Sequence, residues 1–258
     1  MQHIRQIVAG VALGAGSRLK AHAGKVSVVE YKSACAADAV TTLDVEAEQF
    51  IKAQLAKHDA TIGFCGEEGG HSGSDKQYWL VDPIDGTGHF VRGSPYCSTM
   101  IALVEDGMVM ASAIYLFMTG ELFSAVRGEG AMLNGAPLKV SDRPIDHSYL
   151  TCSTDLKDDR SVKTYVQLRQ RAVILQTASA GHEFARVAQG IYDGKVCFDP
   201  YGKDWDYGPG SLLVQEAGGI VTNIGKDTYD FRKHDFIAAN PLVHATLNKP
   251  DSALQLYM

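Results

Sequence analysis

The sequence predicts an α+β fold in which helices and mixed strands pack in alternating α/β/α/β layers. Three observations support this prediction. Apolar residues recur at helical spacing in several segments, short apolar runs typical of strands lie between them, and the strands in the middle of the chain follow one another as a meander. A chain of 258 residues is long enough to bury a large core, either as one domain or as two closely packed halves.

The first helix is amphipathic. Its apolar residues recur every three or four positions, at Ile4, Ile7, Val8, Val11, Ala15 and Leu19. The next elements are, in order, an extended run at residues 26–31, a helix at 44–57, strands at 61–65 and 77–81, and a short helix from 86 or 87 to 92. Both strands deliver acidic residues at their C-terminal ends.

In the middle of the chain, three strand-like runs separated by glycine-containing turns predict an antiparallel meander. The strands are expected at residues 97–104, 109–117 and 122–126. A second half begins near Ser141. Its strands are expected at residues 149–152, 173–175, 195–198, 220–222 and 236–239, and its helices at 159–169, 180–189, 206–217 and the C-terminus. We therefore divide the chain into an N-terminal α+β subdomain, residues 1–140, with most candidate metal ligands, and a C-terminal α/β subdomain, residues 141–258.

Composition excludes several classes of function. Hydrophobic residues make up 45% of the chain and charged residues 21%, which is ordinary for a soluble protein. The formal net charge of −6 leaves no general basic surface, so we expect neither nucleic acid nor acidic lipid as a partner. The cysteines contain no C-x-x-C pair, which argues against a disulfide framework or a zinc site and favours a reducing cytoplasm. They are Cys35, Cys65, Cys97, Cys152 and Cys197.

The N-terminus allows one alternative. Arg5, the apolar stretch at residues 7–15 and the tripeptide A-H-A at 21–23 resemble a secretory signal with a small-residue cleavage site. The helical spacing, and the basic residues Arg18 and Lys20 before that site, favour an amphipathic helix of the folded protein instead. No run reaches the ~18 apolar residues of a membrane span, so we expect no membrane partner.

The most informative segment is residues 79–90, which reads W-L-V-D-P-I-D-G-T-G-H-F. An apolar strand ends at Asp82, and Asp85 with Gly86 supplies a tight turn because glycine accepts positive φ. Two carboxylates so close together repel each other unless cations lie between them. Oxygen ligands suit a hard ion such as Mg²⁺. For this motif alone, an Asp-rich surface turn is the alternative interpretation.

Two more acidic motifs favour a metal site over a surface turn. Residues 64–70 read F-C-G-E-E-G-G, and residues 203–210 read K-D-W-D-Y-G-P-G and open an amphipathic helix with Asp206 in its first turn. In this order, with L-L-V-Q-E-A-G-G at the end, the motifs resemble the inositol monophosphatase family within the superfamily of Mg²⁺-dependent, Li⁺-sensitive phosphatases. The resemblance covers nearly the whole chain. It implies the layered α/β/α/β/α sandwich of the inositol monophosphatase and fructose-1,6-bisphosphatase type.

The resemblance also implies a site for two or three Mg²⁺ ions. Glu67, Asp82 and the backbone carbonyl of Ile84 would hold the first ion, and Asp82, Asp85 and Asp206 the second. Elementary electrostatics agrees, because four converging carboxylates without cations would suffer strong repulsion and desolvation.

Gly86 and Thr87 are assigned to the phosphate group, because free N–H groups at a helix start favour an anion. The resemblance implies that the Thr87 hydroxyl polarises the attacking water together with Asp44, and that Glu67 takes part in catalysis. Asp44 follows the segment D-A-V-T-T-L at residues 38–43, which matches the family's D-x-V-T-x-x-D pattern. The alternative role of Asp44 is an N-cap of the second helix.

Carboxylates are also candidates for binding the alcohol portion of a substrate. Asp199 lies seven positions before Asp206, where many family members keep a carboxylate that binds a substrate hydroxyl. Counting forward from the helix at residues 180–189 reaches Cys197 instead. Glu183 on that helix either contacts a substrate hydroxyl or faces water.

The leading hypothesis is a Mg²⁺-dependent phosphomonoesterase that hydrolyses a small polyol or alcohol phosphate, such as inositol 1-phosphate, by metal-activated water. The chain departs from the family pattern at Gly88-His89 and Gly208-Pro209, so histidinol phosphate, a sugar phosphate and 3′-phosphoadenosine phosphate stay open as substrates. A non-catalytic regulator that binds Mg²⁺ and phosphate is the second hypothesis, and a Ca²⁺-binding structural module the third. The resemblance also implies a homodimer.

Overall fold

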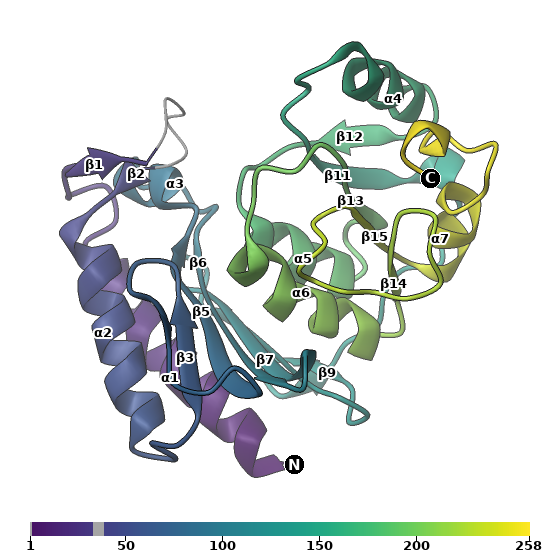
Figure 1. Cartoon of the computed structure of the whole chain (residues 1–258). Helices are drawn as coiled ribbons and strands as arrows, with labels where there is room; N and C mark the ends of the chain where they lie inside the picture. The colour runs from purple at the N-terminus through teal and green to yellow at the C-terminus, as the bar shows by residue number, and fades with distance from the viewer. Residues whose placement is uncertain (1, 33–38) are drawn as a thin grey trace.

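A computed structural model describes residues 2–32 and 39–258 of the chain. Helices and sheets stack in five layers (Figure 1). In order, these are a helix pair, an eight-stranded sheet, a second helix pair, a five-stranded sheet and an outer pair of helices. The predicted α+β sandwich is therefore confirmed. Cys35 and Asp38, which entered the sequence arguments, lie outside the described residues.

The first layer consists of α1 (Gln2–Lys20) and α2 (Thr42–Ala56), which pack on each other and on the larger sheet. The predicted apolar stripe of α1 is buried, with Val8 and Ala15 among its inward residues. Thr41 is the N-cap of α2, and Asp44 completes its capping box by accepting a hydrogen bond from Thr41 N at 2.7 Å. The N-cap role considered for Asp44 is thus wrong, because Thr41 has it.

The larger sheet has the strand order β10-β9-β8-β7-β6-β5-β3-β4. Its strands are β3 (Gly63–Gly66), β4 (Gly70–Ser72), β5 (Gln77–Asp85), β6 (Ser98–Glu105), β7 (Met108–Leu116), β8 (Glu121–Val126), β9 (Ala131–Leu133) and β10 (Ala136–Pro137). Strands β6, β7 and β8 form the predicted antiparallel meander. The pair β3 and β5 is parallel, and both strands end at the same edge with their acidic residues. A separate small ribbon joins β1 (Glu30–Tyr31) to β2 (Ala39–Val40).

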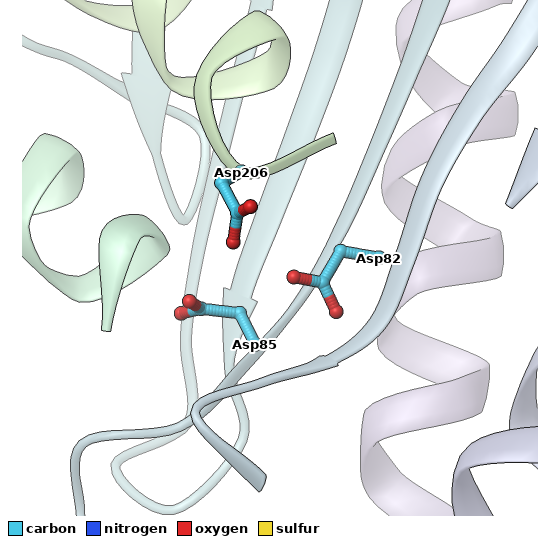
Figure 2. A group of neighbouring side chains, drawn as sticks. All are labelled: Asp82, Asp85 and Asp206. Carbon is cyan, nitrogen blue, oxygen red and sulfur yellow. The ribbon is translucent and has the colours of Figure 1, made fainter. Parts of the chain in front are cut away.

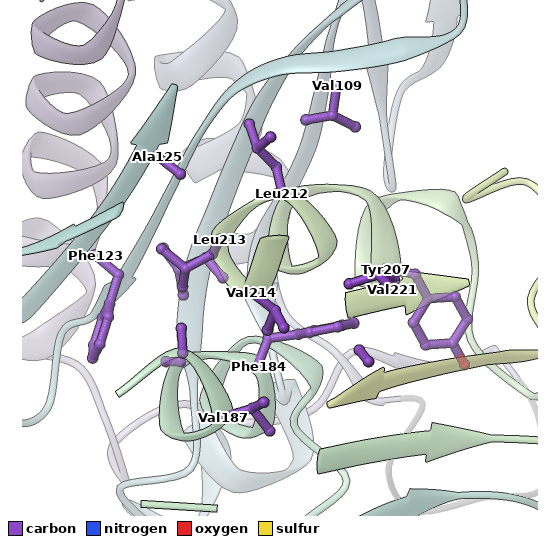
Figure 3. Close-up of a cluster of buried hydrophobic side chains, with 14 of the residues drawn as sticks. Val109, Phe123, Ala125, Phe184, Val187, Tyr207, Leu212, Leu213, Val214 and Val221 are labelled. Atoms are coloured by element: carbon purple, nitrogen blue, oxygen red, sulfur yellow. The ribbon is translucent and has the colours of Figure 1, made fainter. Parts of the chain in front are cut away.

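The middle layer consists of α5 (Ala180–Ala188) and α6 (Asp204–Glu216), which lie between the two sheets (Figure 1). Their apolar side chains form the central core together with residues of both sheets (Figure 3). Phe184 of α5 stacks on Phe236 of the second sheet, with ring centroids 5.7 Å apart, and Tyr207 of α6 packs edge-on against Phe236. Helix α6 begins two residues before the predicted start, so Asp206 lies in its first turn.

The second sheet has the strand order β12-β11-β13-β15-β14. Its strands are β11 (Tyr149–Ser153), β12 (Val173–Leu175), β13 (Gly194–Cys197), β14 (Ile220–Asn223) and β15 (Phe236–Ala239). Strand β11 runs parallel to β12 and β13, whereas β15 is antiparallel to its neighbours. On the outer side lie α4 (Asp159–Arg169) and α7 (Pro241–Leu247), with the 3-10 turns η1 (Ile145–His147) and η2 (Gln255–Tyr257).

The segment between β10 and β11 connects the two sheets. Asp193, fully buried, fixes this connection by accepting a hydrogen bond from Ser141 Oγ at 2.6 Å and pairing with Arg143 at 2.8 Å. Because α5 and α6 pack on the larger sheet although they follow residue 140, the two halves share one core. The division at residues 140 and 141 stays a prediction.

Gly210 marks a close contact between α6 and α5. A β-carbon at this position would lie 2.2 Å from ring atoms of Phe184. We expect Gly210→Ala to lower the free energy of unfolding by about 1–3 kcal/mol, because the densely packed ring has little room to move. Urea unfolding followed by circular dichroism measures this change.

Gly10→Ala is the matched control for that experiment. Gly10 lies inside α1 and a β-carbon there would meet no atom within 4 Å, so alanine should raise the free energy of unfolding by up to about 1 kcal/mol. A Gly210→Ala protein as stable as the Gly10→Ala protein would contradict the described packing.

Candidate functional site

A bulge at the end of β5 brings Asp82 and Asp85 to the same side. The pairing of β5 with β6 is regular up to Asp82 opposite Met100 and resumes with Asp85 opposite Ser98, so β5 carries one extra residue. Pro83 lies in this bulge and has no N–H to donate to the ladder. Residues three apart on a regular strand point to opposite faces, and the bulge removes that constraint. The two carboxylates accordingly face each other (Figure 2).

Four hydrogen-bond donors hold the carboxylate of Asp85. Its Oδ2 accepts from Ser98 Oγ at 2.8 Å, from Ser179 Oγ at 2.6 Å and from the backbone N of Gly181 at 3.0 Å, and its Oδ1 accepts from the backbone N of Ala180 at 2.8 Å. Three of these donors belong to the start of α5, where unpaired N–H groups attract a negative charge. Asp85 therefore ties the end of β5 to a helix of the second half.

Asp206 reaches the same place from α6. Its Oδ2 accepts a hydrogen bond from the backbone N of Lys203 at 2.5 Å, which fixes the first turn of the helix. One carboxylate oxygen from each of Asp82, Asp85 and Asp206 lies within 4.8 Å of the others (Figure 2). The structure thus brings together three of the predicted ligands, although Asp206 follows the other two by more than a hundred residues in the sequence.

Glu67 lines the same cavity but is paired with a lysine. It follows the end of β3, and Lys32 Nζ donates to Glu67 Oε1 at 2.9 Å and to Glu68 Oε1 at 2.8 Å. Within residues 2–32 and 39–258, the oxygens grouped within 4.8 Å come from the three aspartates and not from Glu67. A cation beside the aspartates would compete with Lys32 for the Glu67 carboxylate.

Burial and mutual repulsion favour the protonated forms of these carboxyl groups. Burial is the largest cause that raises the pKa of Asp82 well above its ordinary value, and repulsion from Glu67 and Asp85 adds to it. Burial, followed by repulsion from Glu67, raises the pKa of Asp206 to about 7. Burial also raises the pKa of Asp85, although its hydrogen bonds offset part of that effect. Such a cluster holds either protons or cations.

The donor set fits a hard divalent cation. Asp82 Oδ1 is buried and has no hydrogen-bond partner among the described residues, which is costly for a carboxylate oxygen. A cation would satisfy that oxygen and reduce the repulsion within the cluster. The three grouped side chains offer carboxylate oxygens, the ligand type that Mg²⁺ prefers. The carbonyl of Ile84 belongs to the same cavity lining.

Thr87 connects this cluster to α2. Its Oγ1 lies 2.8 Å from Asp44 Oδ1 and 2.8 Å from the carbonyl oxygen of Ile84. A hydroxyl has one hydrogen and donates to one of these acceptors at a time. Burial is the main cause that raises the pKa of Asp44. Asp44 therefore contacts both its own helix start and the predicted catalytic threonine.

Gly86 forms the turn into α3 (Thr87–Val91). Its φ of 78° lies in the left-handed region, and a β-carbon would come within 2.5 Å of the carbonyl oxygen of Tyr96. Only glycine meets both conditions without strain. Gly86 and Thr87 line the cavity beside the aspartates.

These groups share one cavity of about 410 Å³. Its lining includes residues that the sequence arguments did not assign, namely Ser153, Tyr201 and Lys203. Trp205 packs against the central core and also lines the cavity. Local patterns gave no signal for Ser153 and Tyr201, because they approach the aspartates only when the second sheet packs on α5 and α6.

The carboxylates predicted for the alcohol portion lie elsewhere. Asp199 adopts a left-handed φ of 50°, its Oδ2 accepts from the backbone N of Lys157 at 2.8 Å, and it is absent from the described cavity lining. Cys197 is fully buried beside Tyr207, and like Asp199 it does not line the described cavity.

Glu183 requires a correction as well. It neither faces water nor lines the described cavity, because it is buried and forms an ion pair with Lys195. A lysine in the predicted buried strand at residues 195–198 was the sequence signal for such a partner.

Comparison with known proteins agrees with this geometry. A family model described as the inositol monophosphatase family matches residues 1–254. The chain belongs to the inositol monophosphatase family. The resemblance stated from the motifs is therefore confirmed.

Relatives within this family carry two kinds of name. An inositol-1-monophosphatase of Rhizobium meliloti is 36% identical over 81% of this chain and 81% of that protein. A Nus factor SuhB of Pseudomonas aeruginosa is 33% identical over 93% of this chain and 92% of that protein. A solved structure of the Thermotoga maritima IMPase superposes with a TM-score of 0.86 at 28% identity, covering 99% and 96% of the two chains. Among the described helices, none combines the length and apolar character needed to cross a membrane.

The raised pKa of Asp206 predicts how stability depends on pH without cations. Between its ordinary pKa of 3.8 and the folded value of about 7, the unfolded chain has released a proton that the folded protein keeps. The free energy of unfolding therefore falls as the pH rises through this window. In EDTA, we expect Asp206→Asn to reduce the total fall in the free energy of unfolding by about 1–2 kcal/mol. This is less than the full pKa shift would give, because Asp206 is partly exposed and interacts with the neighbouring carboxylates. Urea unfolding across the pH window measures it.

The exposed Asp227 offers a matched control, Asp227→Asn, which should keep the wild-type dependence on pH. Adding MgCl₂ at the high end of the window should stabilise the wild-type protein, since the ionised carboxylates bind the cation. The same slope for wild type and Asp206→Asn would contradict the raised pKa of Asp206.

Proposed function

We propose that the protein is a Mg²⁺-dependent phosphomonoesterase that releases inorganic phosphate from a small polyol or related alcohol phosphate. The observation that carries the proposal is the convergence of Asp82, Asp85 and Asp206 beside the Thr87–Asp44 contact in one cavity. Membership of the inositol monophosphatase family supports a phosphatase.

Each acidic residue has a role in binding cations. Asp82, Asp85 and Asp206 would hold Mg²⁺, with Glu67 and the carbonyl of Ile84 completing the ligand set. Bound Mg²⁺ would neutralise the phosphate charge, orient the ester and lower the pKa of a bound water. The hydrogen bonds from Ser179 and from the start of α5 keep Asp85 oriented before any ion binds.

Thr87 and Asp44 would prepare the water that attacks phosphorus. When the Thr87 hydroxyl donates its hydrogen to Asp44 Oδ1, its lone pairs are free to accept a hydrogen bond from the water. The water oxygen then forms a bond to phosphorus as the bond to the alcohol oxygen breaks. The proton of the water passes to Asp44 by way of the Thr87 hydroxyl, and the leaving alcohol oxygen takes up a proton from solvent water. This route requires no covalent enzyme intermediate.

Gly86 and Thr87 are proposed to contact the phosphate group through their backbone N–H groups. The support is their place on the cavity lining next to the aspartates, together with the left-handed turn at Gly86. We further propose from the family resemblance two or three Mg²⁺ per site, sensitivity to Li⁺ and a homodimer. A cytoplasmic location and the division into subdomains 1–140 and 141–258 stay predictions of the sequence.

The relatives named Nus factor SuhB favour a second candidate function. In it, the protein binds Mg²⁺ and a phosphorylated ligand without hydrolysis and acts as a regulator. The Thr87–Asp44 contact argues against it, because a protein that only binds has little use for a hydroxyl placed to orient water.

Phosphate release from a panel of esters tests the proposal. The panel comprises inositol 1-phosphate, histidinol phosphate, a sugar phosphate and 3′-phosphoadenosine phosphate. We expect turnover with MgCl₂ and none with EDTA. Asp82→Asn and Thr87→Ala should each lower kcat about 100-fold or more, because they remove a metal ligand and the water-orienting hydroxyl.

The exposed Asp142 provides a control, and Asp142→Asn should keep wild-type activity. Turnover that persists in EDTA or in Asp82→Asn would overturn the metal-dependent mechanism. Binding of an ester with no phosphate release from any member of the panel would favour the regulator instead.

A further inference from the structure

A glutamate of α2 is buried against the loop that carries Glu67. Glu48 is 5% exposed, and both oxygens of its carboxylate accept hydrogen bonds from that loop. Oε2 accepts from the backbone N of Glu68 at 2.8 Å, and Oε1 accepts from the backbone N of Gly69 at 2.7 Å. Hydrogen bonds from N–H groups to an ionised carboxylate are stronger than those between neutral groups. The roles proposed for the site residues do not include this buried acid.

The loop is shaped to receive the Glu48 carboxylate. Residues 67–69 join β3 to β4, and a glycine precedes and follows the two glutamates. A β-carbon at Gly66 would lie 2.2 Å from Glu48 Oε2, and one at Gly69 would lie 2.7 Å from Glu48 Oε1. A side chain at either position would push the carboxylate off the backbone. The glycines of the G-E-E-G segment therefore make room for Glu48.

Glu67 lies between two fixed points of the backbone. On one side, Gly66 belongs to β3 and pairs with β5 in the larger sheet. On the other side, Glu48 holds the N–H of Glu68. The Glu67 side chain has Lys32 as its partner, and Lys32 is itself exposed. The direction of the Glu67 side chain therefore depends on its backbone, which Glu48 fixes.

The same face of α2 holds the Thr87–Asp44 pair. Asp44 lies four positions before Glu48, the spacing that places two side chains on one face of a helix. Asp44 Oδ1 lies 2.8 Å from Thr87 Oγ1. Helix α2 also packs on β5, the strand that ends at the acidic cluster. One helix thus fixes the water-orienting pair and the Glu67 loop relative to the aspartates.

A role in stability alone does not explain Glu48. Burial raises its pKa, and the hydrogen bonds from Glu68 and Gly69 offset part of that rise. Removing a carboxylate from water is costly, and a loop at the surface can bond its N–H groups to water instead. The cost is understandable when the loop carries a metal ligand, because groups that orient a ligand raise the affinity for the ion.

We propose that Glu48 is a positioning residue that fixes the loop at residues 66–69 and thereby directs Glu67 toward a divalent cation beside the aspartates. The inference rests on the proposed function for one point, the role of Glu67 as a Mg²⁺ ligand. Glu48 is absent from the described cavity lining, so it acts through Glu67 and touches neither the cation nor the substrate.

Binding of Mn²⁺ to the protein without substrate tests this role. Mn²⁺ accepts the same oxygen ligands as Mg²⁺, and its electron paramagnetic resonance signal measures the free ion. Glu48→Gln keeps the size of the side chain, but its amide nitrogen is a donor and loses one of the two loop hydrogen bonds. We expect Glu48→Gln to weaken Mn²⁺ binding about tenfold.

The dependence of activity on MgCl₂ gives a second measurement. For Glu48→Gln, the MgCl₂ concentration at half-maximal phosphate release from inositol 1-phosphate should rise about tenfold, as Mn²⁺ binding weakens. At saturating MgCl₂, kcat should change less than about twofold, because Glu67 is still present to bind the ion.

Glu46→Gln is the matched control. Glu46 is an exposed residue of the same helix, so this substitution removes an equal charge without touching the loop. Mn²⁺ binding should stay within about twofold of the wild-type value, because salt screens the effect of an exposed charge.

A double-mutant cycle separates positioning from a purely structural role. Glu67→Gln should weaken Mn²⁺ binding, and adding Glu48→Gln to it should weaken the binding no further, because both act through one ligand. Circular dichroism verifies that each variant is folded. If Glu48→Gln does not fold, Gly69→Ala takes its place with the same expected loss, because its β-carbon displaces the carboxylate from the loop side.

The outcomes distinguish this inference from the proposed function. Equal Mn²⁺ affinities of wild type and Glu48→Gln, or an equal effect of Glu48→Gln with and without Glu67→Gln, would overturn the inference and leave the phosphatase intact. A wild-type protein that binds Mn²⁺ but releases no phosphate from any ester would overturn the proposed function alone. A wild-type protein that binds no Mn²⁺ would overturn both.

Discussion

The structure depends on one electrostatic constraint, the burial of several like charges at a single point. Asp82, Asp85 and Asp206 come from two secondary-structure elements and place their oxygens within 4.8 Å of one another. Carboxylates at such distances in a poorly hydrated place repel strongly, and their raised pKa values express that cost. Apolar residues at these positions would give the folded protein more stability than the buried carboxylates do. The arrangement is understandable as a site for cations.

The fold meets this constraint with elements from both halves of the chain. The bulge at Pro83 aligns two carboxylates on β5, and the start of α5 donates hydrogen bonds to Asp85. The first turn of α6 supplies Asp206. Because α5 and α6 also form the core between the two sheets, the packing of that core sets the geometry of the site. A substitution that disturbs the packing of α5 or α6 should therefore also disturb the positions of the carboxylates at the starts of these helices.

The acidic cluster and most elements could be predicted from sequence because their signals are local. A short stretch of sequence is enough to recognise each of these features: acids at the ends of apolar runs, glycine in the turn at residue 86, and the meander strands. The arrangement around Ser153, Glu183 and Lys195 could not be predicted in this way. Its partners are 12 and 42 residues apart, and only the register of β11 with β13 and the packing of α5 bring them together. Asp199 is a related case, since its carboxylate accepts a hydrogen bond from the backbone N of Lys157 and it is absent from the described cavity lining.

Anomalous diffraction from crystals soaked in MnCl₂, with Mn²⁺ standing in for Mg²⁺, shows directly whether the three aspartates bind a cation. We expect at least one strong anomalous peak coordinated by oxygens of Asp82, Asp85 and Asp206. A crystal with no peak at these carboxylates under saturating Mn²⁺, or with the three side chains turned apart, would contradict this expectation.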